Sequence, residues 1–233
     1  MALKYYFDLM SQPSRAVYIF LKANKINFEP KPIALRKGEH LTEEYKRVNP
    51  WMKVPTLEDN GFILTESVAI LRYLSQKYKL PEHWYPHSDL QKQARIDEYL
   101  HWQHLNTRLQ AAMVFQHKLL IPVAKNEKIN EKKVQRFKAE LPKVIAHIET
   151  YFLRDQKFIG GEDISVADLL AACELMQLFP VFEEDVYESN LKIKAWMERV
   201  RTTLNPYFDE GHAITYRTRD SYKKIGPSLG AKL

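Results

Sequence analysis

The chain has 233 residues, 45% hydrophobic and 27% charged, which is enough to bury a substantial core without disulfides or a structural metal. Seven glycines and 12 prolines exclude collagen-like and low-complexity chains, and the single cysteine, Cys173, excludes an intrachain disulfide and a cysteine-based zinc site. The net charge of +6 is uneven: residues 1–80 carry 13 basic and 8 acidic side chains. It indicates ordinary solubility or a small anionic ligand, because no Lys/Arg run is dense enough for a nucleic-acid arm.

The first 80 residues alternate strand and helix patterns. Aromatic and apolar runs predict strands, apolar side chains at helical spacing predict helices, and Asp59-Asn60-Gly61 predicts a hairpin turn. The resulting order is strand, helix, edge strand, two hairpin strands and helix, over residues 3–7, 15–25, 28–33, 54–58, 62–64 and 67–78. A parallel strand-helix-strand unit beside a hairpin predicts a small mixed sheet with helices on its faces.

Three places in this region put polar groups at the ends of elements. Ser11 lies in a turn before a helix, where it can cap the helix or help to bind an anion beside the free N–H groups. Pro55 enters a strand after a loop, a position that is often cis, and Lys53 and Val54 precede it. Glu66 and Ser67 open another helix, where they can bind an ammonium and a carboxylate group or act only as caps.

From Asp89 onward the strand signals vanish. Residues 81–87 break both periodicities and predict a linker, so we expect domains at 1–80 and 88–233. Helical patterns predict an all-α helix bundle and cover residues 92–118, 131–153, 165–179 and 191–204. Pro142 lies inside the pattern over 131–153, so we expect a kink or a break there.

The helix that starts near residue 165 has an unusually complete start signal. Ser165 is a suitable N-cap, and Asp168 three residues later can complete a capping box. Ile164 and Leu169 occupy the positions of a hydrophobic staple. We interpret this motif as a folding device, and Cys173 within the same helix as an inert core thiol.

Other chemistry is weakly supported. Three histidines fall along one helical pattern, but no carboxylate cluster completes a metal site, and neither a G-x-S-x-G motif nor a P-loop is present. No apolar stretch is long enough to span a membrane, and the N-terminus does not read as a secretory signal, so we expect a cytoplasmic protein. Ala231-Lys232-Leu233 differs from the peroxisomal address Ser-Lys-Leu by one small residue, which leaves peroxisomal targeting open.

Taken together, the motifs resemble those of the cytosolic glutathione S-transferases, most closely the theta class. Each motif is weak alone, but their order and spacing over residues 3–200 carry the resemblance. The matching segments are Ser11-Gln12-Pro13-Ser14-Arg15-Ala16, Asn49-Pro50, Lys53-Val54-Pro55-Thr56-Leu57, Leu64-Thr65-Glu66-Ser67-Val68-Ala69-Ile70, Tyr73-Leu74, Asp97-Glu98-Tyr99-Leu100, Trp102-Gln103-His104 and Ile164-Ser165-Val166-Ala167-Asp168-Leu169.

The resemblance implies a thioredoxin-like N-terminal domain with a mixed four-stranded sheet, an all-helical C-terminal domain, and a homodimer. It also implies glutathione as cosubstrate. We expect no further cofactor and no metal, and the charge pattern and the lack of a spanning stretch lead us to expect neither a nucleic acid nor a membrane as partner. Ser11 matches the catalytic serine of the family. The glutathione-binding positions are matched by His40, Lys53, Val54, Glu66 and Ser67.

The implied reaction uses the thiolate of glutathione as nucleophile. An unperturbed thiol has a pKa of about 8.5, so a hydrogen bond from Ser11 that stabilises the thiolate makes the thiol more reactive at neutral pH. Other classes use a tyrosine, but Tyr5 and Tyr6 fall inside the predicted strand. The electrophile, a small hydrophobic halide, sulfate ester or hydroperoxide, is expected between the domains beside Leu9, Met10 and Arg108.

Two other functions compete with this one. A noncatalytic transferase-like protein could bind hydrophobic ligands or serve as an assembly module, but it has no need of the full set of glutathione-binding residues. A glutaredoxin-like oxidoreductase needs a cysteine after the first strand, and the turn at Ser11 has none.

Overall fold

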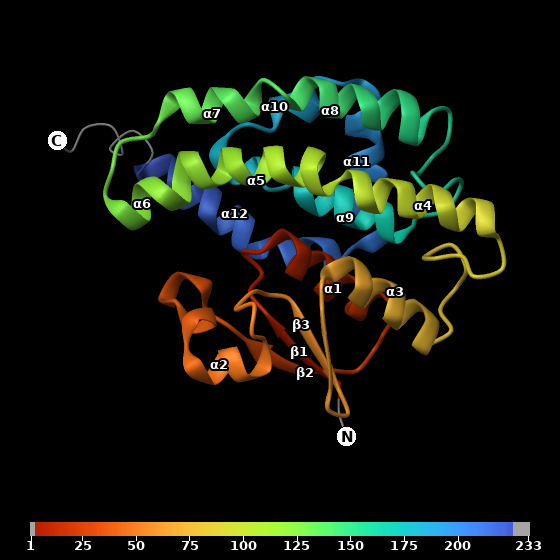
Figure 1. The fold of residues 1–233 in the computed structure, drawn as a ribbon. Helices are drawn as coiled ribbons and strands as arrows, with labels where there is room; N and C mark the ends of the chain where they lie inside the picture. The colour runs from red at the N-terminus through yellow and green to blue at the C-terminus, as the bar shows by residue number, and fades with distance from the viewer. Residues whose placement is uncertain (1–2, 226–233) are drawn as a thin grey trace.

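The computed structural model describes residues 3–225, which form a small sheet domain and a larger helical domain stacked on it (Figure 1). The mixed four-stranded sheet and the all-helical second part match the predicted fold class. The tripeptide Ala231-Lys232-Leu233 lies outside the described residues. The limits of the two domains, 1–80 and 88–233, remain predictions from the sequence.

The sheet has the strand order β2-β1-β3-β4. β1 pairs in parallel with β2 and antiparallel with β3, and β3 and β4 form the predicted hairpin. The proline-containing β2 occupies an edge, where a missing N–H is tolerated. The strands are β1 (Lys4–Phe7), β2 (Glu29–Pro32), β3 (Thr56–Asp59) and β4 (Phe62–Thr65).

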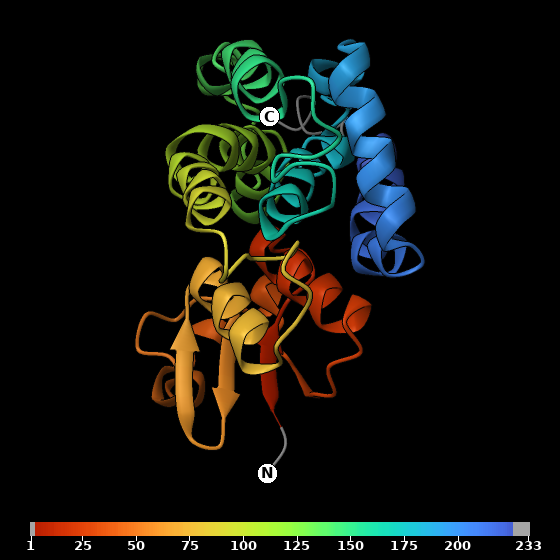
Figure 2. The ribbon, with the colours of Figure 1, turned by 90° about the vertical axis from the view of Figure 1, so that its right-hand side faces the viewer.

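Helices cover both faces of this sheet. Tyr5 and Tyr6 point to opposite faces because side chains alternate along a strand. The Tyr5 hydroxyl donates to a carbonyl of α1 (Gln12–Ala23), whereas the Tyr6 ring lies 6.1 Å from that of Tyr45 in α2 (Glu43–Val48). α1 and α3 (Ser67–Lys77) therefore lie between the sheet and the helical domain (Figure 2). The sequence patterns missed α2 and the short turns η1 (Leu35–Lys37) and η2 (Glu39–Leu41).

A single long helical run forms one side of the second domain. It contains α4 (Leu90–Trp102), α5 (Leu109–Phe115) and α6 (Ile121–Lys125), joined by the π-helical segments η3 (His104–Arg108) and η4 (Gln116–Leu120). A second run is broken just before Pro142, as predicted, into α7 (Glu131–Lys138) and α8 (Leu141–His147), followed by η5 (Ile148–Leu153). A π turn inserts an extra residue and so changes which side chains share a face.

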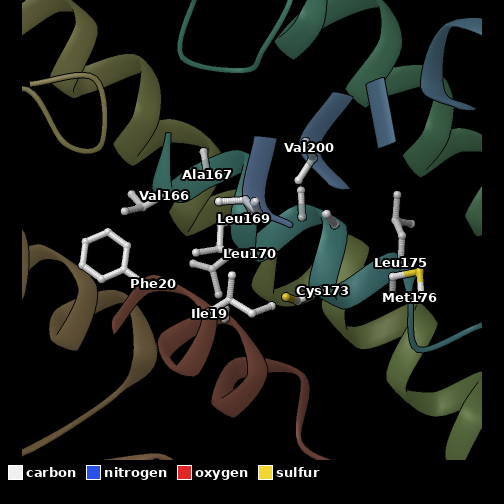
Figure 3. Packing of buried hydrophobic residues seen from close by; sticks show 14 of the residues in the cluster. Ile19, Phe20, Val166, Ala167, Leu169, Leu170, Cys173, Leu175, Met176 and Val200 are labelled. Atoms are coloured by element: carbon white, nitrogen blue, oxygen red, sulfur yellow. The ribbon is translucent and has the colours of Figure 1, made fainter. Parts of the chain in front are cut away.

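The centre of the helical domain is α9 (Val166–Leu175), which starts with the predicted capping box. The Ser165 Oγ accepts from the N–H of Ala167, and the Asp168 carboxylate accepts from the N–H of Ser165. Asp168 also accepts from the indole of Trp196 at 2.9 Å. Cys173 is completely buried, and burial raises the pKa of its thiol to about 12, as expected of an inert core thiol. In Figure 3, Cys173 points toward Ile19 of α1.

The remaining elements complete the bundle. The short η6 (Phe179–Val181) and α10 (Asp185–Glu188) lead to α11 (Leu191–Leu204), whose bounds match the prediction. α12 (Tyr207–Ile225) was not predicted, and it packs along α1. The last helix thus helps to hold the two domains together. Among residues 3–225, no helix combines the length and apolar character needed to cross a membrane.

Candidate active site

Two adjoining hollows of 480 and 360 Å³ lie where the loops of the sheet domain meet the helical domain. They share Trp51, Lys53, Val54 and Arg108, so we treat them as one cleft with a larger and a smaller hollow. The predicted site residues on the larger hollow are Met10, Ser11, His40, Lys53, Val54 and Arg108. Those on the smaller hollow are Lys53, Val54, Glu66, Ser67 and Arg108.

Ser11 both caps α1 and lines the larger hollow, so a capping role and a ligand-binding role are compatible. Its Oγ accepts the N–H of Ser14 at 3.4 Å, and the hydroxyl hydrogen stays available to a ligand. The preceding loop is held firmly: the Asp8 carboxylate accepts from the N–H groups of Met10 and Leu35 at 2.8 and 2.9 Å. Ser11 is therefore presented from a fixed loop at the positive end of a twelve-residue helix.

Neither tyrosine of β1 reaches the cleft. The Tyr5 hydroxyl is buried and donates to the Ser14 carbonyl at 2.7 Å. The Tyr6 hydroxyl donates to Glu58 at 2.8 Å, and burial together with this bond raises the pKa of Tyr6 to about 12. Both tyrosines contact the sheet and the helices beside it, and we assign them a structural role.

The loop before β3 presents the backbone of Val54 to both hollows. The Val54–Pro55 peptide is cis. The Lys53 carbonyl accepts from the Tyr45 hydroxyl and from the Asn49 amide, each at 2.7 Å. Within residues 3–225 the N–H and C=O of Val54 have no backbone partner, so both can pair with an extended ligand.

Glu66 and Ser67 lie at the junction of β4 and α3. Glu66 has a φ of 66°, a positive value that a non-glycine residue rarely adopts and that costs about 1–3 kcal/mol. It is the N-cap residue, but its side chain makes no capping bond. Ser67 does not cap the helix either: its Oγ is buried without a hydrogen-bond partner in the described residues. The free donors of this helix start face the smaller hollow.

His40 and Lys53 supply basic groups to the cleft. His40 lies on η2, and its buried Nδ1 has no partner within the described chain. Lys53 is exposed where the two hollows meet. Together with the helix starts at Ser11 and Ser67, they make this wall suited to an anionic ligand.

The opposite wall comes from the long helical run. Arg108 ends the π turn η3 and reaches both hollows, and apolar or small residues follow it along the run. These are Ala112, Phe115 and Leu120. Met10 lines the same hollow, but Leu9 lines neither hollow, contrary to expectation. The Leu9 carbonyl accepts from Arg15 at 2.9 Å, and its side chain packs against the core.

The lining residues that were not predicted to belong to the site include Gln12, Trp51 and Gln177. Gln12 neighbours Ser11, and its buried Nε2 has no partner in the described residues, so its place in the motif was a usable signal. Gln177 reaches the larger hollow from beyond α9, and Trp51 is 74% exposed on the loop before Lys53. Nothing local in the sequence marks these two residues as part of a cleft.

Comparison with known proteins agrees with this architecture. Residues 1–76 match the family model "Glutathione S-transferase, N-terminal domain", and residues 111–203 match "Glutathione S-transferase, C-terminal domain". The chain is 44% identical to glutathione S-transferase theta-1 of Bos taurus, over all of this chain and 96% of that protein.

Two human structures are also similar. One is human glutathione-S-transferase T1-1 in its apo form, with a TM-score of 0.87 and 39% identity over 97% of this chain and 98% of that one. The other is a human theta-class glutathione transferase in complex with the glutathione conjugate of 1-menaphthyl sulfate, with a TM-score of 0.90 and 39% identity over 99% and 93% of the chains.

The stacked sheet and helical domains with a polar cleft between them therefore define a glutathione S-transferase, and the chain belongs to that family. The full-length similarity to theta-1 proteins places it in the theta class.

Proposed function

We propose that this chain is an active glutathione transferase that joins the thiolate of glutathione to small hydrophobic electrophiles. One observation carries the proposal: the Ser11 hydroxyl hydrogen, the Val54 backbone and the Ser67 hydroxyl are free to bond a ligand along one wall of a cleft whose other wall is largely apolar. The theta-class relative bound to a glutathione conjugate supports the same use of the cleft.

Glutathione would bind along the wall of the sheet domain. Its γ-glutamyl end has an amine and a carboxylate, which suit the Glu66 carboxylate and the donors at Ser67. Its extended backbone suits the free N–H and C=O of Val54. The glycyl carboxylate suits the basic groups of His40 and Lys53. This order brings the cysteinyl sulfur to the larger hollow, where Ser11 lies.

Ser11 then acts by donating its hydroxyl hydrogen to the sulfur. The bond stabilises the thiolate and lowers the pKa of the bound thiol from about 8.5. A charge-assisted hydrogen bond contributes about 1.5–3 kcal/mol, roughly 10- to 100-fold in an equilibrium constant. The thiolate attacks the carbon that bears the leaving group, a C–S bond forms, and halide or sulfate departs with the electron pair. Ser11 forms no covalent intermediate.

The electrophile would bind against the helical wall. Met10 and Phe115 give the larger hollow an apolar lining, and Arg108 adds a cation there that suits the departing anion. Organic hydroperoxides are a further candidate substrate class, reduced by two molecules of glutathione to an alcohol, water and oxidised glutathione.

We also propose that the protein is a homodimer. Large apolar side chains are exposed on β4 and on the long helical run, where a second subunit would cover them; they are Phe62, Ile63, Leu105 and Leu109. Light scattering coupled to size exclusion tests this, and a monomer at micromolar concentration would contradict it.

The decisive assay compares wild type and Ser11→Ala with glutathione and a panel of alkyl halides, an arylmethyl sulfate and cumene hydroperoxide. We expect conjugation by wild type and a loss of about 10- to 100-fold in Ser11→Ala, with a modest change in glutathione affinity. The matched control, Tyr6→Phe, should change little. Glutathione binding without turnover of any substrate would favour a noncatalytic binding protein, and loss of activity in Tyr6→Phe alone would assign the thiolate to the tyrosine.

A further inference from the structure

The centre of the helical domain holds a carboxylate with no hydrogen bond. Glu174 of α9 is completely buried, and neither of its side-chain oxygens has a hydrogen-bond partner within residues 3–225. Its neighbours along the helix, Cys173 and Leu175, are core residues (Figure 3). A buried charge without partners is expensive, so a carboxylate at this position needs a cation or a function.

Two arginines face this carboxylate from two other elements. The Nε of Arg108, at the end of η3, lies 3.9 Å from Glu174 Oε1, and Arg15 of α1 contributes a second positive charge nearby. The two terminal nitrogens of Arg15 are occupied by neutral acceptors: they donate to the carbonyls of Leu9, Met10 and Cys173 and to the side chain of Gln177. Its buried Nε has no hydrogen-bond partner in the described residues. Burial raises the pKa of Glu174 to about 7, and the two arginines oppose that rise.

The guanidinium of Arg108 differs from that of Arg15 in its exposure and in its hydrogen-bond partners. Its side chain is 33% exposed, it lines both hollows, and its guanidinium donates no hydrogen bond to any residue in the described range. Glu174 is the only carboxylate within salt-bridge distance of it in that range. An exposed arginine without such a partner samples many rotamers, and a fixed anion behind it restricts them.

We propose that Glu174 is a positioning residue that holds the Arg108 guanidinium at the wall of the cleft, where the negative charge of the reaction develops. Glu174 does not line either hollow, so it acts through Arg108 and does not touch substrate. At 3.9 Å, the ion pair leaves the guanidinium N–H groups free for an anion from the second substrate. The inference rests on the proposed function, because it assumes that the sulfur of glutathione reaches this hollow.

Binding of two glutathione analogues tests this without relying on turnover. Glutathione sulfonate carries an anion at the position of the sulfur, and S-methylglutathione carries a neutral group there. Titration calorimetry gives the ratio of the two affinities, the sulfonate preference, for wild type, Glu174→Gln, Arg108→Gln and the double variant. Glu174→Gln keeps the side-chain volume and removes the charge, so the helix packing is preserved.

We expect Glu174→Gln to lower the sulfonate preference about tenfold, close to the effect of Arg108→Gln, and the double variant to be no worse than Arg108→Gln. A purely electrostatic role predicts the opposite sign, because removing a negative charge strengthens the binding of an anion. An unchanged or increased preference in Glu174→Gln would overturn the proposal. The proposal would also be overturned if Glu174→Gln lowered the sulfonate preference by the same factor in the wild-type and the Arg108→Gln backgrounds.

Two controls separate this outcome from others. Glu183→Gln changes another buried carboxylate, which pairs with Lys118 and Lys138 and lines neither hollow, and it should leave the preference unchanged. If Glu174→Gln lowers the thermal midpoint so far that it cannot be titrated, Glu174→Asp, which keeps the charge, should show an intermediate preference. Failure of wild type to bind either analogue would instead contradict the proposed function.

Discussion

The two walls of the cleft are built in different ways. The wall of the sheet domain presents groups at chain turns: Ser11 and Ser67 stand at helix starts, and Val54 precedes a strand. The helical wall presents side chains from the middle of one long helical run. The π turns η3 and η4 determine which of these side chains point toward the cleft. The first wall therefore suits the invariant peptide of glutathione, and the second suits a variable electrophile, because side chains can change without altering the backbone.

The largest effect on the helical domain alone is expected from Asp168→Ala, at the start of α9. Asp168 accepts from the N–H of Ile159, from both the N–H and the hydroxyl of Ser165, and from the indole of Trp196, all buried. Alanine leaves these donors without a partner, so we expect a loss of about 3–5 kcal/mol in the free energy of unfolding, measured by denaturant titration. A loss below about 1 kcal/mol would show that the capping box does not hold this domain together.

The contact between the two domains is tested by Gly211→Ala. A Cβ at Gly211 of α12 would lie 2.7 Å from Ile19 Cγ1 of α1. Overpacking of this kind costs about 1–3 kcal/mol, seen as a lower thermal midpoint. In an Ile19→Ala background the same change should cost almost nothing, and an equal cost there would contradict the close packing of the two helices.

The sheet-domain wall is tested by Ser67→Ala. If the Ser67 hydroxyl donates to the carboxylate of glutathione, its loss weakens glutathione binding about tenfold and leaves the KM of the electrophile unchanged. Ser75→Ala is the matched control, because Ser75 is a buried serine of the same helix whose hydroxyl donates to the Leu71 carbonyl. Equal effects of the two variants on glutathione affinity would remove Ser67 from the site.

The smallest expected effect separates the two walls most cleanly. Ala112 lines the larger hollow on α5, and Ala112→Phe fills part of the space assigned to the electrophile. We expect its KM for a bulky electrophile to rise about fivefold, within the range that a few apolar groups contribute to pocket selectivity. Glutathione affinity, measured in parallel, should stay constant, and a parallel loss would show that the walls are not independent.

This contrast also explains what the sequence could predict. Features fixed by neighbouring residues were predictable: the hairpin at Gly61, the capping box at Ser165, the break before Pro142 and the position of Ser11. Features fixed by tertiary packing were not predictable. Glu174 meets Arg108 only because α9 lies against the long helical run, and Leu9 packs against the core although it is close to Ser11 in the sequence.

The missed helix α12 shows a second limit of sequence patterns. Its buried stripe includes His212 and Thr215 beside Phe208 and Tyr222, so polar residue types occupy core positions. Hydrophobic periodicity does not detect such a face, because His and Thr count as polar residue types. Here both bond to the backbone of their own helix: the His212 Nδ1 bonds the Phe208 carbonyl at 2.8 Å, and the Thr215 hydroxyl donates to the His212 carbonyl at 2.7 Å.

The most direct test of the central claim is the pKa of the thiol of bound glutathione in wild type and in Ser11→Ala. Thiolate absorbs in the ultraviolet, so a pH titration of the complex reports the ionisation of the sulfur without any electrophile. We expect a thiol pKa in wild type at least one unit below the unperturbed value of about 8.5, and a return toward that value in Ser11→Ala. Equal thiol pKa values in the two proteins would contradict the role of Ser11.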